Sequence, residues 1–399
     1  MAKHTLSDLY QMQSLPLSAK IRMTENRIRA WVDEYGEDGV YVSFSGGKDS
    51  TVLLNIVRNL YPNIKAVFVD TGLEYPEIRE FVKTYENVDW LRPKMNFRQV
   101  IEKYGYPFIS KEVSACVDGA RRYLKSLSDR QTDRQTVPNA PFMADILGID
   151  RRKDKENPDY RAVKMGNIPS EPVRYKILCG SLKHKENGVE TDEASRMYDK
   201  SRYKFFLDAP FNISSKCCNV MKKQPVHAYA RQTGRNPMTA QMASESRLRT
   251  EQWIKNGCNG FDMKSPISNP MAFWTEQDVL LYIYENHLPI ASVYGEIVKD
   301  YDGMGQLDGQ MDMSELASEF GIFDVGRPLL KTTGCSRTGC MFCGYGCHLE
   351  KPGDGRFERM KETHPKQYDY IMRPKEQGGL NYKEVIDWIN EHGNMHIRY

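Results

Sequence analysis

The sequence predicts an α/β fold built on a doubly wound, mostly parallel sheet, followed by a mixed helical and cysteine-rich C-terminal region. Short β-branched runs alternate with helical apolar patterns over residues 16–104, and this alternation is typical of parallel strands joined by helical crossovers. A glycine pair separates one buried strand from the helix that follows it. Polar residues follow the next strand, and ligands bind beyond the carboxyl ends of strands in such sheets.

The individual elements follow in chain order. The patterns predict helices over residues 16–36, 51–58, 76–86 and 97–104 and strands over 40–42, 65–70 and 88–91. Residues 220–256 are expected to be helical. A helix is expected over 274–283, with Thr275 as its N-cap and Asp278 at its third helical position. A short helix is expected near 382–391.

The domain organisation follows from changes in composition along the chain. Residues 1–115 and 166–300 are assigned to one nucleotide-binding α/β domain, and residues 301–399 to a cysteine-rich region with a C-terminal helix. Residues 116–165 form a charged insertion. A solvated surface is favoured for this insertion over a lid or a contact with a phosphate backbone, because most charge runs are only solvated.

Bulk composition excludes some classes of protein. The chain has 399 residues and a formal net charge of +3, which is too small to indicate a nucleic-acid partner by itself. No apolar run approaches the roughly 18 residues of a membrane span. The N-terminal residues lack the apolar core of a signal peptide. A cytoplasmic protein without membrane contact is therefore expected.

Residues 43–50 carry the strongest functional signal. They lie between a predicted strand and a helix N-terminus, where free backbone N–H groups and the helix dipole favour an anion, usually phosphate. Glycines allow close backbone approach, lysine adds a positive charge and serines add hydroxyl groups. The residues suited to this role are Ser45, Gly46, Gly47, Lys48 and Ser50. The common P-loop is excluded, since Val42 and Asp49 occupy two of its defining positions.

The same string resembles the S-G-G-x-D-S loop of the adenine nucleotide alpha hydrolase superfamily, whose members split ATP between the α and β phosphates. Further segments resemble motifs of phosphoadenylyl sulfate reductases and their relatives. These segments are D-T-G-x-E-x-P-E at 70–77, S-K-x-V at 110–113, paired cysteines at 217–218, E-S-x-x-R within 244–249, N-P-x-x-x-W-T-x-x-D-V at 269–279 and G-C-x-x-C at 339–343. The chain is identified as a member of the phosphoadenylyl sulfate reductase-like family.

The resemblance implies roles for individual residues. The nucleotide phosphates, with Mg²⁺, would be held by Ser45, Gly46, Gly47, Asp49 and Ser50. Asp70 and Gly72 would lie beside the adenosine, and Lys111 and Arg247 are candidates for binding anionic groups. The expected catalytic residues are Ser45, Lys48, Asp49, Lys111 and Arg247.

The cysteines indicate a metal centre. Cys335, Cys340, Cys343 and Cys347 have the spacing C-x4-C-x2-C-x3-C, and these four thiolates alone could hold zinc. The family resemblance instead implies a [4Fe–4S] cluster on Cys217, Cys218, Cys340 and Cys343. Iron–sulfur is favoured over zinc, but which four of the six cysteines bind stays open.

Three activities are compatible with these motifs. Reductases of this family use a nucleophilic cysteine in a C-terminal tail, whereas the last cysteine here is Cys347, so the covalent step lacks its nucleophile. The favoured prediction is an ATP pyrophosphatase that adenylates an acceptor for sulfur transfer, such as nucleic-acid thiolation or phosphorothioation. Its partners would include a sulfur donor or cysteine desulfurase. A sulfonucleotide reductase and a non-catalytic nucleotide-binding module of a larger assembly stay open as alternatives.

Overall fold

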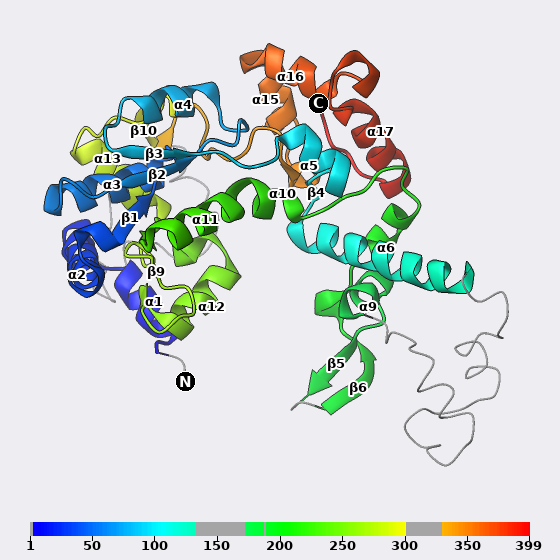
Figure 1. The fold of residues 1–399 in the computed structure, drawn as a ribbon, viewed down its shortest axis with the longest axis horizontal. Coiled ribbons are helices and arrows are strands. Elements are labelled where there is room, and N and C mark those ends of the chain that lie inside the picture. The colour runs from blue at the N-terminus through cyan, green and yellow to red at the C-terminus, as the bar shows by residue number, and fades with distance from the viewer. Residues whose placement is uncertain (1–2, 133–171, 187–188, 301–328) are drawn as a thin grey trace, which may run out of the picture. The chain divides into compact units, whose positions relative to one another are not determined.

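The computed structural model describes residues 3–132, 172–186, 189–300 and 329–399 (Figure 1). The chain divides into two compact units, each made of two separate stretches of sequence. Unit 1 comprises Met1–Phe97 and Asn219–Met341, and unit 2 comprises Arg98–Cys218 and Phe342–Tyr399. These units are defined by spatial contacts, and the composition-based boundaries at residues 115, 165 and 300 stay predictions.

The expected charged insertion of residues 116–165 lies mostly outside the described residues. Its first part, up to residue 132, continues helix α6 (Lys111–Thr132) of unit 2. Residues 301–328 of the expected cysteine-rich region also lie outside the described part of the chain.

A six-stranded sheet forms the centre of unit 1 and confirms the predicted fold class. The strand order is β3-β2-β1-β7-β9-β8. The strands are β3 (Val88–Leu91), β2 (Ala66–Val69), β1 (Val40–Ser43), β7 (Asn236–Met238), β9 (Ile267–Ser268) and β8 (Asn259–Gly260). All neighbours pair in parallel except β8 and β9, which are antiparallel.

The strand order reverses beside β1. The chain proceeds from β1 to β2 and β3 on one side and later adds β7 and β9 on the other. The β1 residue Val42 pairs with Ala66 on one side and with Met238 on the other. Ligands of doubly wound sheets bind at such a switch point, outside the carboxyl ends of the strands. The segment that follows β1 therefore occupies the expected ligand position.

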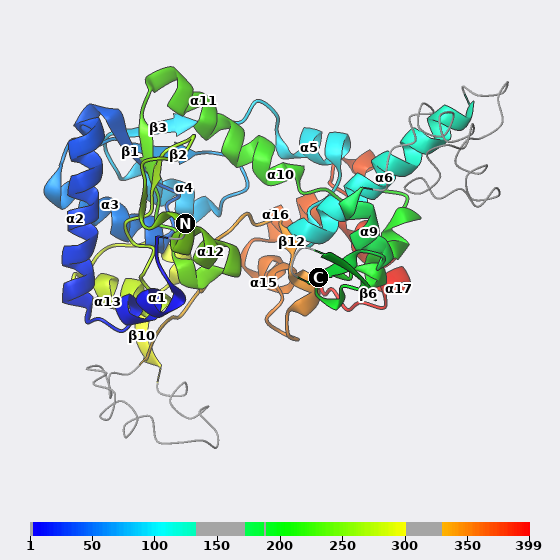
Figure 2. The same cartoon turned by 90° about the horizontal axis from the view of Figure 1, so that it is seen from below.

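Alternation along β1 fixes which helices cover each face of the sheet. Val40 and Val42 belong to the main core, which also includes residues of α2 (Leu17–Tyr35), α3 (Lys48–Leu60) and α13 (Glu276–Glu285). Tyr41 points the other way and packs with Val67 and Tyr229 of α11 (Gln224–Thr233). Figure 2 shows α2 and α11 on different sides of the strands. Because β1 is buried on both faces, it reads as a continuous apolar run rather than an alternating one.

The predicted helices of the N-terminal half are confirmed with small shifts in their ends. They are α2, α3, α4 (Pro76–Lys83) and α5 (Phe97–Tyr104). Helix α13 begins as expected, because Thr275 and Asp278 form a complete capping box. The predicted C-terminal helix is α17 (Tyr382–Gly393).

The helical prediction for residues 220–256 is confirmed at both ends of the range but wrong in its middle. The structure has a π-helical turn (Asn219–Lys223), then α11, strand β7 and helix α12 (Arg247–Asn256). Gly234 ends α11 in a left-handed conformation with φ of 71°, a common helix C-terminus signal. The three residues of β7 then pair with β1, so tertiary pairing overrides the local helical pattern.

The remaining elements complete the two units. Unit 1 also contains α1 (Leu6–Gln13), β10 (Ile297–Asp300) and β11 (Leu329–Thr332). Unit 2 contains β4 (Phe108–Ile109), α6, α9 (Val173–Cys179), β5 (Lys183–Glu186), β6 (Val189–Ala194), α10 (Lys216–Cys218), β12 (Gly344–Tyr345), α15 (Arg356–Thr363), α16 (Pro365–Met372) and α17. Within the described residues, no helix has both the length and the apolar character needed to cross a membrane.

Candidate functional site

The loop after β1 makes a tight turn that brings the chain to the N-terminus of α3. Gly47 is the N-cap of this helix, and Gly46 has a φ of 72°. A Cβ atom placed on Gly46 would lie 2.7 Å from Cγ2 of Val82 and 2.8 Å from Cγ2 of Ile78. Both neighbours belong to α4. Glycine is therefore required here both by the backbone conformation and by the close packing of α4.

Serine hydroxyls hold the loop in shape. The Oγ atoms of Ser45 and Ser50 lie 3.0 Å apart, and Ser50 Oγ donates to the Gly47 carbonyl oxygen at 2.9 Å. The Ser45 amide donates to Ser50 Oγ at 3.2 Å, and the Gly47 amide donates to Ser45 Oγ at 3.3 Å. These bonds organise the loop before any ligand arrives. The predicted residues Ser45, Gly46, Gly47 and Ser50 are thus brought together at one helix N-terminus.

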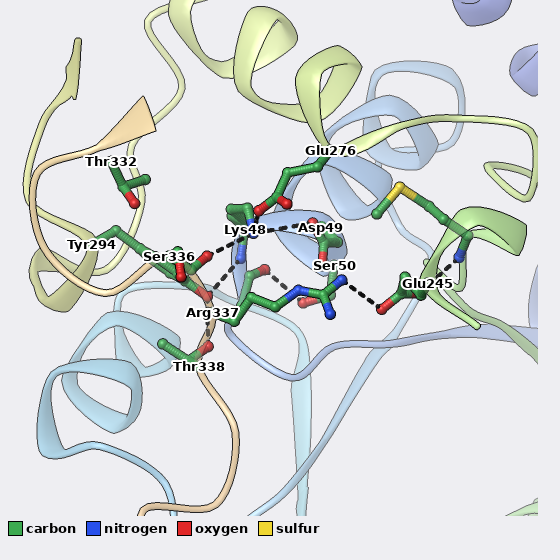
Figure 3. A network of polar contacts seen from close by, with 12 residues as sticks. Lys48, Asp49, Ser50, Glu245, Glu276, Tyr294, Thr332, Ser336, Arg337 and Thr338 are labelled. Carbon is green, nitrogen blue, oxygen red and sulfur yellow. Dashed lines mark hydrogen bonds and ion pairs between the residues drawn. The ribbon is translucent and has the colours of Figure 1, made fainter. Parts of the chain in front are cut away.

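Lys48 joins the loop to other parts of unit 1 (Figure 3). Its side chain is only 3% exposed, and its Nζ lies 3.0 Å from Glu276 Oε1 and donates to the Ser336 carbonyl oxygen at 2.9 Å. Its backbone amide donates to the Tyr294 hydroxyl at 3.1 Å. The ammonium group was expected to face phosphate. In this structure its contacts instead tie the loop to α13 and to the segment after β11.

Asp49 carries a carboxylate at the start of α3. Its Oδ1 atom is buried and accepts no hydrogen bond from the described residues, and Lys48 Nζ lies 3.8 Å away. Burial raises the pKa of this carboxyl group, while the positive charges of Lys48 and Arg337 oppose the rise. A buried oxygen of this kind is suited to a cation or to a hydrogen-bond donor on a ligand.

Two arginines meet Glu245 near the loop. Arg249 of α12 forms an ion pair with Glu245. Arg337 Nη2 lies 3.4 Å from Glu245 Oε1, a contact drawn in Figure 3. Burial lowers the pKa of Arg249 and the charge of Arg337 lowers it further, whereas Asp49 raises it. Arg249 is therefore within electrostatic range of the loop carboxylate. Neither Arg249 nor Arg337 was singled out from the sequence.

The sequence did contain a signal for Arg249. In the E-S-x-x-R pattern the arginine stands four residues after Glu245, which is position 249. Arg247, the residue expected to bind an anion, has a side chain 76% exposed and pairs with Glu251 at 2.8 Å. This (i, i+4) pair is a typical contact on the surface of a helix.

Asp70 and Gly72 follow β2 and lie at the same sheet edge as the loop after β1. The Asp70 side chain is 6% exposed, and its Oδ2 lies 3.0 Å from an Arg79 nitrogen. The Gly72 amide donates to Asp70 Oδ1 at 3.3 Å, and Gly72 has a φ of 73°. The carboxylate therefore stabilises the turn after β2.

Lys111 belongs to unit 2, whereas the loop residues belong to unit 1. It is the first residue of α6. The thiol of Cys343 is in the same unit. Burial raises the pKa of this thiol and the nearby Cys218 adds to the rise, whereas Arg356 and Lys111 lower it. The structure thus places Lys111 within electrostatic range of the cysteines of unit 2.

The six candidate metal ligands divide between the units. Cys217, Cys218, Cys343 and Cys347 belong to unit 2, and Cys335 and Cys340 belong to unit 1. None of the nine cysteines, all within the described residues, forms a disulfide. Among the residues that the structure describes, no three His, Cys, Asp or Glu side chains converge as a metal site. In this structure the described cysteines are therefore not gathered into a preformed zinc or cluster site.

Cys347 and Cys335 have distinct surroundings. Cys347 is 2% exposed and its thiol donates to the Gly344 carbonyl oxygen at 2.8 Å. Burial raises the pKa of Cys347 to about 12. Cys335 lies in the segment after β11, where its amide donates to the Val293 carbonyl oxygen at 2.9 Å. Burial raises the pKa of Tyr294 to about 12, and nearby Cys335 adds slightly to the rise. The Tyr294 hydroxyl accepts a hydrogen bond from the Lys48 amide.

Two adjoining cavities lie beside the sheet of unit 1 and share part of their lining. The smaller, about 150 Å³, is lined by Ser45 of the loop and by Glu74 and Thr338. The larger, about 810 Å³, lies against β1, β7, α11 and α12. Ser43 and Lys222 line both. A volume of several hundred Å³ is typical of small-molecule sites.

Comparison with known proteins identifies the family. The family model of the phosphoadenosine phosphosulfate reductase domain matches residues 39–127 and 174–344. The chain belongs to this family. This phosphoadenosine phosphosulfate (PAPS) reductase family binds nucleotides, and the loop after β1 lies at the switch point of the sheet, where ligands of such sheets bind.

Individual relatives match only shorter stretches. The uncharacterized protein MJ0973 of Methanocaldococcus jannaschii is 33% identical over 96 residues, covering 22% of this chain and 23% of the relative. A phosphoadenosine 5'-phosphosulfate reductase of Xylella fastidiosa (strain M23) is 33% identical over 79 residues, covering 20% and 33%. The matches thus span at most about a third of these relatives' own length.

A match among solved structures is phosphoadenylyl-sulfate (PAPS) reductase from Candida auris in a phosphate complex. It has a TM-score of 0.33 and 12% sequence identity, and the match covers 70% of this chain and 88% of that one.

Proposed function

We propose that this chain is an ATP-dependent adenylating enzyme, an ATP pyrophosphatase of the PAPS reductase family that activates an acceptor for sulfur transfer. Thiolation or phosphorothioation of nucleic acid is the reaction class that we favour. The single observation that carries the proposal is the preorganised loop at the α3 N-terminus, with the buried Asp49 oxygen beside it.

The loop residues bind and orient the triphosphate in this proposal. The amides of Gly47 and Lys48 already donate within the protein, so the phosphate oxygens are contacted by the other N–H groups in the first turn of α3 and by the hydroxyls of Ser45 and Ser50. Bound Mg²⁺, for which Asp49 is the candidate ligand, supplies charge neutralisation at the phosphates. Arg249 and Arg337 stabilise negative charge that develops as an acceptor oxygen attacks the α-phosphorus and pyrophosphate leaves. Positioning and charge stabilisation are sufficient for such a reaction.

The surroundings of Cys347 support adenylation over sulfonucleotide reduction. Residues 348–399 contain no cysteine. Cys347 itself is buried and donates its thiol proton to a backbone carbonyl, so it is poorly placed to attack a sulfonyl sulfur. Sulfur would instead come from a donor such as a cysteine desulfurase.

Pyrophosphate release from ATP tests the proposal. The Ser45→Ala/Asp49→Ala variant is expected to lower the rate at least about 100-fold, since removal of one preorganised contact alone costs about 10²-fold. Ser7→Ala/Asp33→Ala serves as a matched control, because both residues are exposed and lie outside the loop. Equal rates in all three proteins would count against the site.

A sulfonucleotide reductase is the second candidate, because the family match itself favours it. Sulfite release from a sulfonucleotide with thioredoxin as reductant would establish this activity. Nucleotide binding with neither sulfite nor pyrophosphate release would indicate a non-catalytic module instead.

We also propose that the cysteines bind a [4Fe–4S] cluster, with Cys217, Cys218, Cys340 and Cys343 as its ligands by family resemblance and zinc as the alternative. Three of these ligands lie in unit 2, where Cys218 and Cys343 interact electrostatically. Anaerobic purification followed by metal analysis and an absorption spectrum tests the proposal. Stoichiometric zinc in a colourless protein would overturn it.

A further inference from the structure

The charged residues that line the larger cavity of unit 1 are all basic. Its charged residues are Lys222, Lys223, Arg231, Arg235 and Arg249, accompanied by His227. Among the described residues that line it, none is Asp or Glu. A concave surface lined by one sign of charge concentrates ligands of the opposite sign. The cavity is therefore suited to an anion.

Some of these cations already have partners within the protein. Arg235 donates through Nε to the Asp38 carbonyl oxygen at 2.8 Å and through Nη1 to the Tyr229 hydroxyl at 3.2 Å. Arg249 pairs with Glu245. These two side chains shape the cavity wall, and their charges are partly satisfied by their neighbours.

Lys223 and Arg231 are different. Both are exposed, and in the described part of the chain neither side chain forms a hydrogen bond or an ion pair. They flank α11, Lys223 just before it and Arg231 in its last turn. The side chains of Lys223 and Arg231 can therefore each bind a phosphate group without breaking an existing contact.

Polar groups beside the cations can recognise more than charge. The cavity is also lined by Asn236, Gln241 and Asn269, whose amides both donate and accept hydrogen bonds. Amide side chains are suited to the edges of nucleobases. The volume of about 810 Å³ exceeds what a single inorganic anion needs.

The position of the cavity connects it with the phosphate loop. Ser43, Lys222 and Val226 line both this cavity and the smaller one that reaches Ser45. Two ligands, one at the loop and one in the larger cavity, would therefore lie next to each other at the switch point of the sheet.

We propose that the larger cavity binds the acceptor, and that the acceptor is a phosphate-bearing nucleotide unit. This inference rests on the proposed adenylation, in which ATP occupies the loop. The nucleotide unit is either a free nucleotide or part of a nucleic-acid strand. Both carry the same chemistry, a phosphate for Lys223 and Arg231 and a base edge for the amides.

Direct binding tests the cavity without requiring turnover. The probes are adenosine 3',5'-bisphosphate and a fluorescent 5'-phosphorylated six-nucleotide single strand, each titrated with a non-hydrolysable ATP analogue saturating the loop. The Lys223→Glu/Arg231→Glu variant is expected to weaken binding of at least one probe at least tenfold. It should also reduce the salt dependence of strand binding, because two phosphate contacts are lost.

The matched control is Arg22→Glu/Lys255→Glu. It makes the same change in net charge at two exposed residues that do not line the cavity. It should bind both probes within twofold of the unmodified protein. Arg231→Gln, which only removes one charge, should weaken probe binding by an intermediate amount. It gives a second measurement in case the double variant does not fold.

The outcomes separate the two proposals. Preferential binding of the strand assigns nucleic acid as the source of the phosphate, and preferential binding of the bisphosphate assigns a free nucleotide. Unchanged binding in Lys223→Glu/Arg231→Glu, or an equal loss in the control, overturns the acceptor site. Probe binding that depends on Lys223 and Arg231 in a protein that releases no pyrophosphate overturns adenylation but retains the cavity as a nucleotide site.

Discussion

Gly46 combines a left-handed backbone conformation with close contact to α4. A side chain at this position meets Val82 and Ile78 at less than 3 Å, and packed core positions do not yield easily to added atoms. The motif glycine is thus needed for stability, whatever ligand the loop binds.

Gly46→Ala is expected to lower the free energy of unfolding by about 2–5 kcal/mol. Roughly 1–2 kcal/mol comes from the left-handed conformation and about 1–3 kcal/mol from overpacking. Gly234→Ala is the control, because Gly234 has a φ of 71° but a Cβ atom added there would meet no other atom within 4 Å. It should show only the conformational part. Urea unfolding measures both, and equal losses would contradict the packing argument.

Asp49 makes stability depend on pH. Its pKa is raised in the folded protein, chiefly by burial, so the folded state binds the proton more tightly than the unfolded state does. Stability conferred by the protonated form is present at low pH and falls as pH rises above the ordinary carboxyl value of 3.8. Asp49→Asn is therefore expected to be more stable than the unmodified protein without ligand, by an amount that grows from pH 4 upward.

Urea denaturation of both proteins at several pH values, in the absence of nucleotide, checks this expectation. Asp33→Asn provides the control, because that carboxylate is exposed. A stability difference that stays constant between pH 4 and pH 7 would contradict the role of burial. Asp49→Asn should also bind ATP and Mg²⁺ more weakly if this carboxylate serves the site.

At the scale of single residues, the loop residues could be predicted from the sequence, but the charged residues around them could not. Ser45, Gly46 and Gly47 are adjacent in the chain, so one motif is enough to place them. The Ser336 and Glu276 contacts of Lys48 join segments more than 200 positions apart, and no local pattern contains them.

At the scale of elements, α13 is the helix whose start was predicted most fully. Asp278 accepts hydrogen bonds from the amide and the hydroxyl of Thr275 at 2.7 and 2.8 Å. It also forms an ion pair at 2.7 Å with Lys20, whose side chain is 3% exposed. The cap could be predicted from the sequence because its two residues are three positions apart. The ion pair with Lys20 of α2 could not, because the two residues are far apart in the chain.

Asp278→Ala is expected to destabilise the protein by about 3–5 kcal/mol, because it leaves the buried ammonium of Lys20 without its counter-charge. Thr275→Ala should cost only about 1 kcal/mol, the usual value for an N-cap. Thermal or urea unfolding measures both. Replacement of both charges in Lys20→Met/Asp278→Ala should recover part of the loss, and a strictly additive loss would argue against the ion pair.

At the scale of the whole molecule, the parallel sheet was predictable but the division into units was not. Strand and helix periods are local, so they identify β1, β2 and β3 and the doubly wound class. Each unit, in contrast, combines stretches more than 100 residues apart. The packing of Tyr382 with Tyr106 and Phe108 in unit 2 depends on tertiary structure alone.

Tyr382→Ala tests how the two stretches of unit 2 depend on each other. Tyr382 is fully buried among aromatic rings, and its hydroxyl donates to the Phe342 carbonyl oxygen at 2.6 Å. The substitution is expected to cost about 3–5 kcal/mol, whereas Tyr382→Phe should cost about 1 kcal/mol. Calorimetry should show a lower midpoint for one transition. An unchanged thermogram would contradict the assigned role.

Strand β1, at the centre of the sheet, is expected to be protected from local unfolding. Val40, Tyr41 and Val42 have no exposed surface, and the strand is hydrogen-bonded to β2 and β7. Amides in such a strand exchange with deuterium only through the most extensive openings of a fold. The peptide just before the phosphate loop should thus be among the last to exchange, while edge strands such as β3 and β8 exchange sooner. Local unfolding of the edge strands would then leave the loop after β1 in its folded conformation.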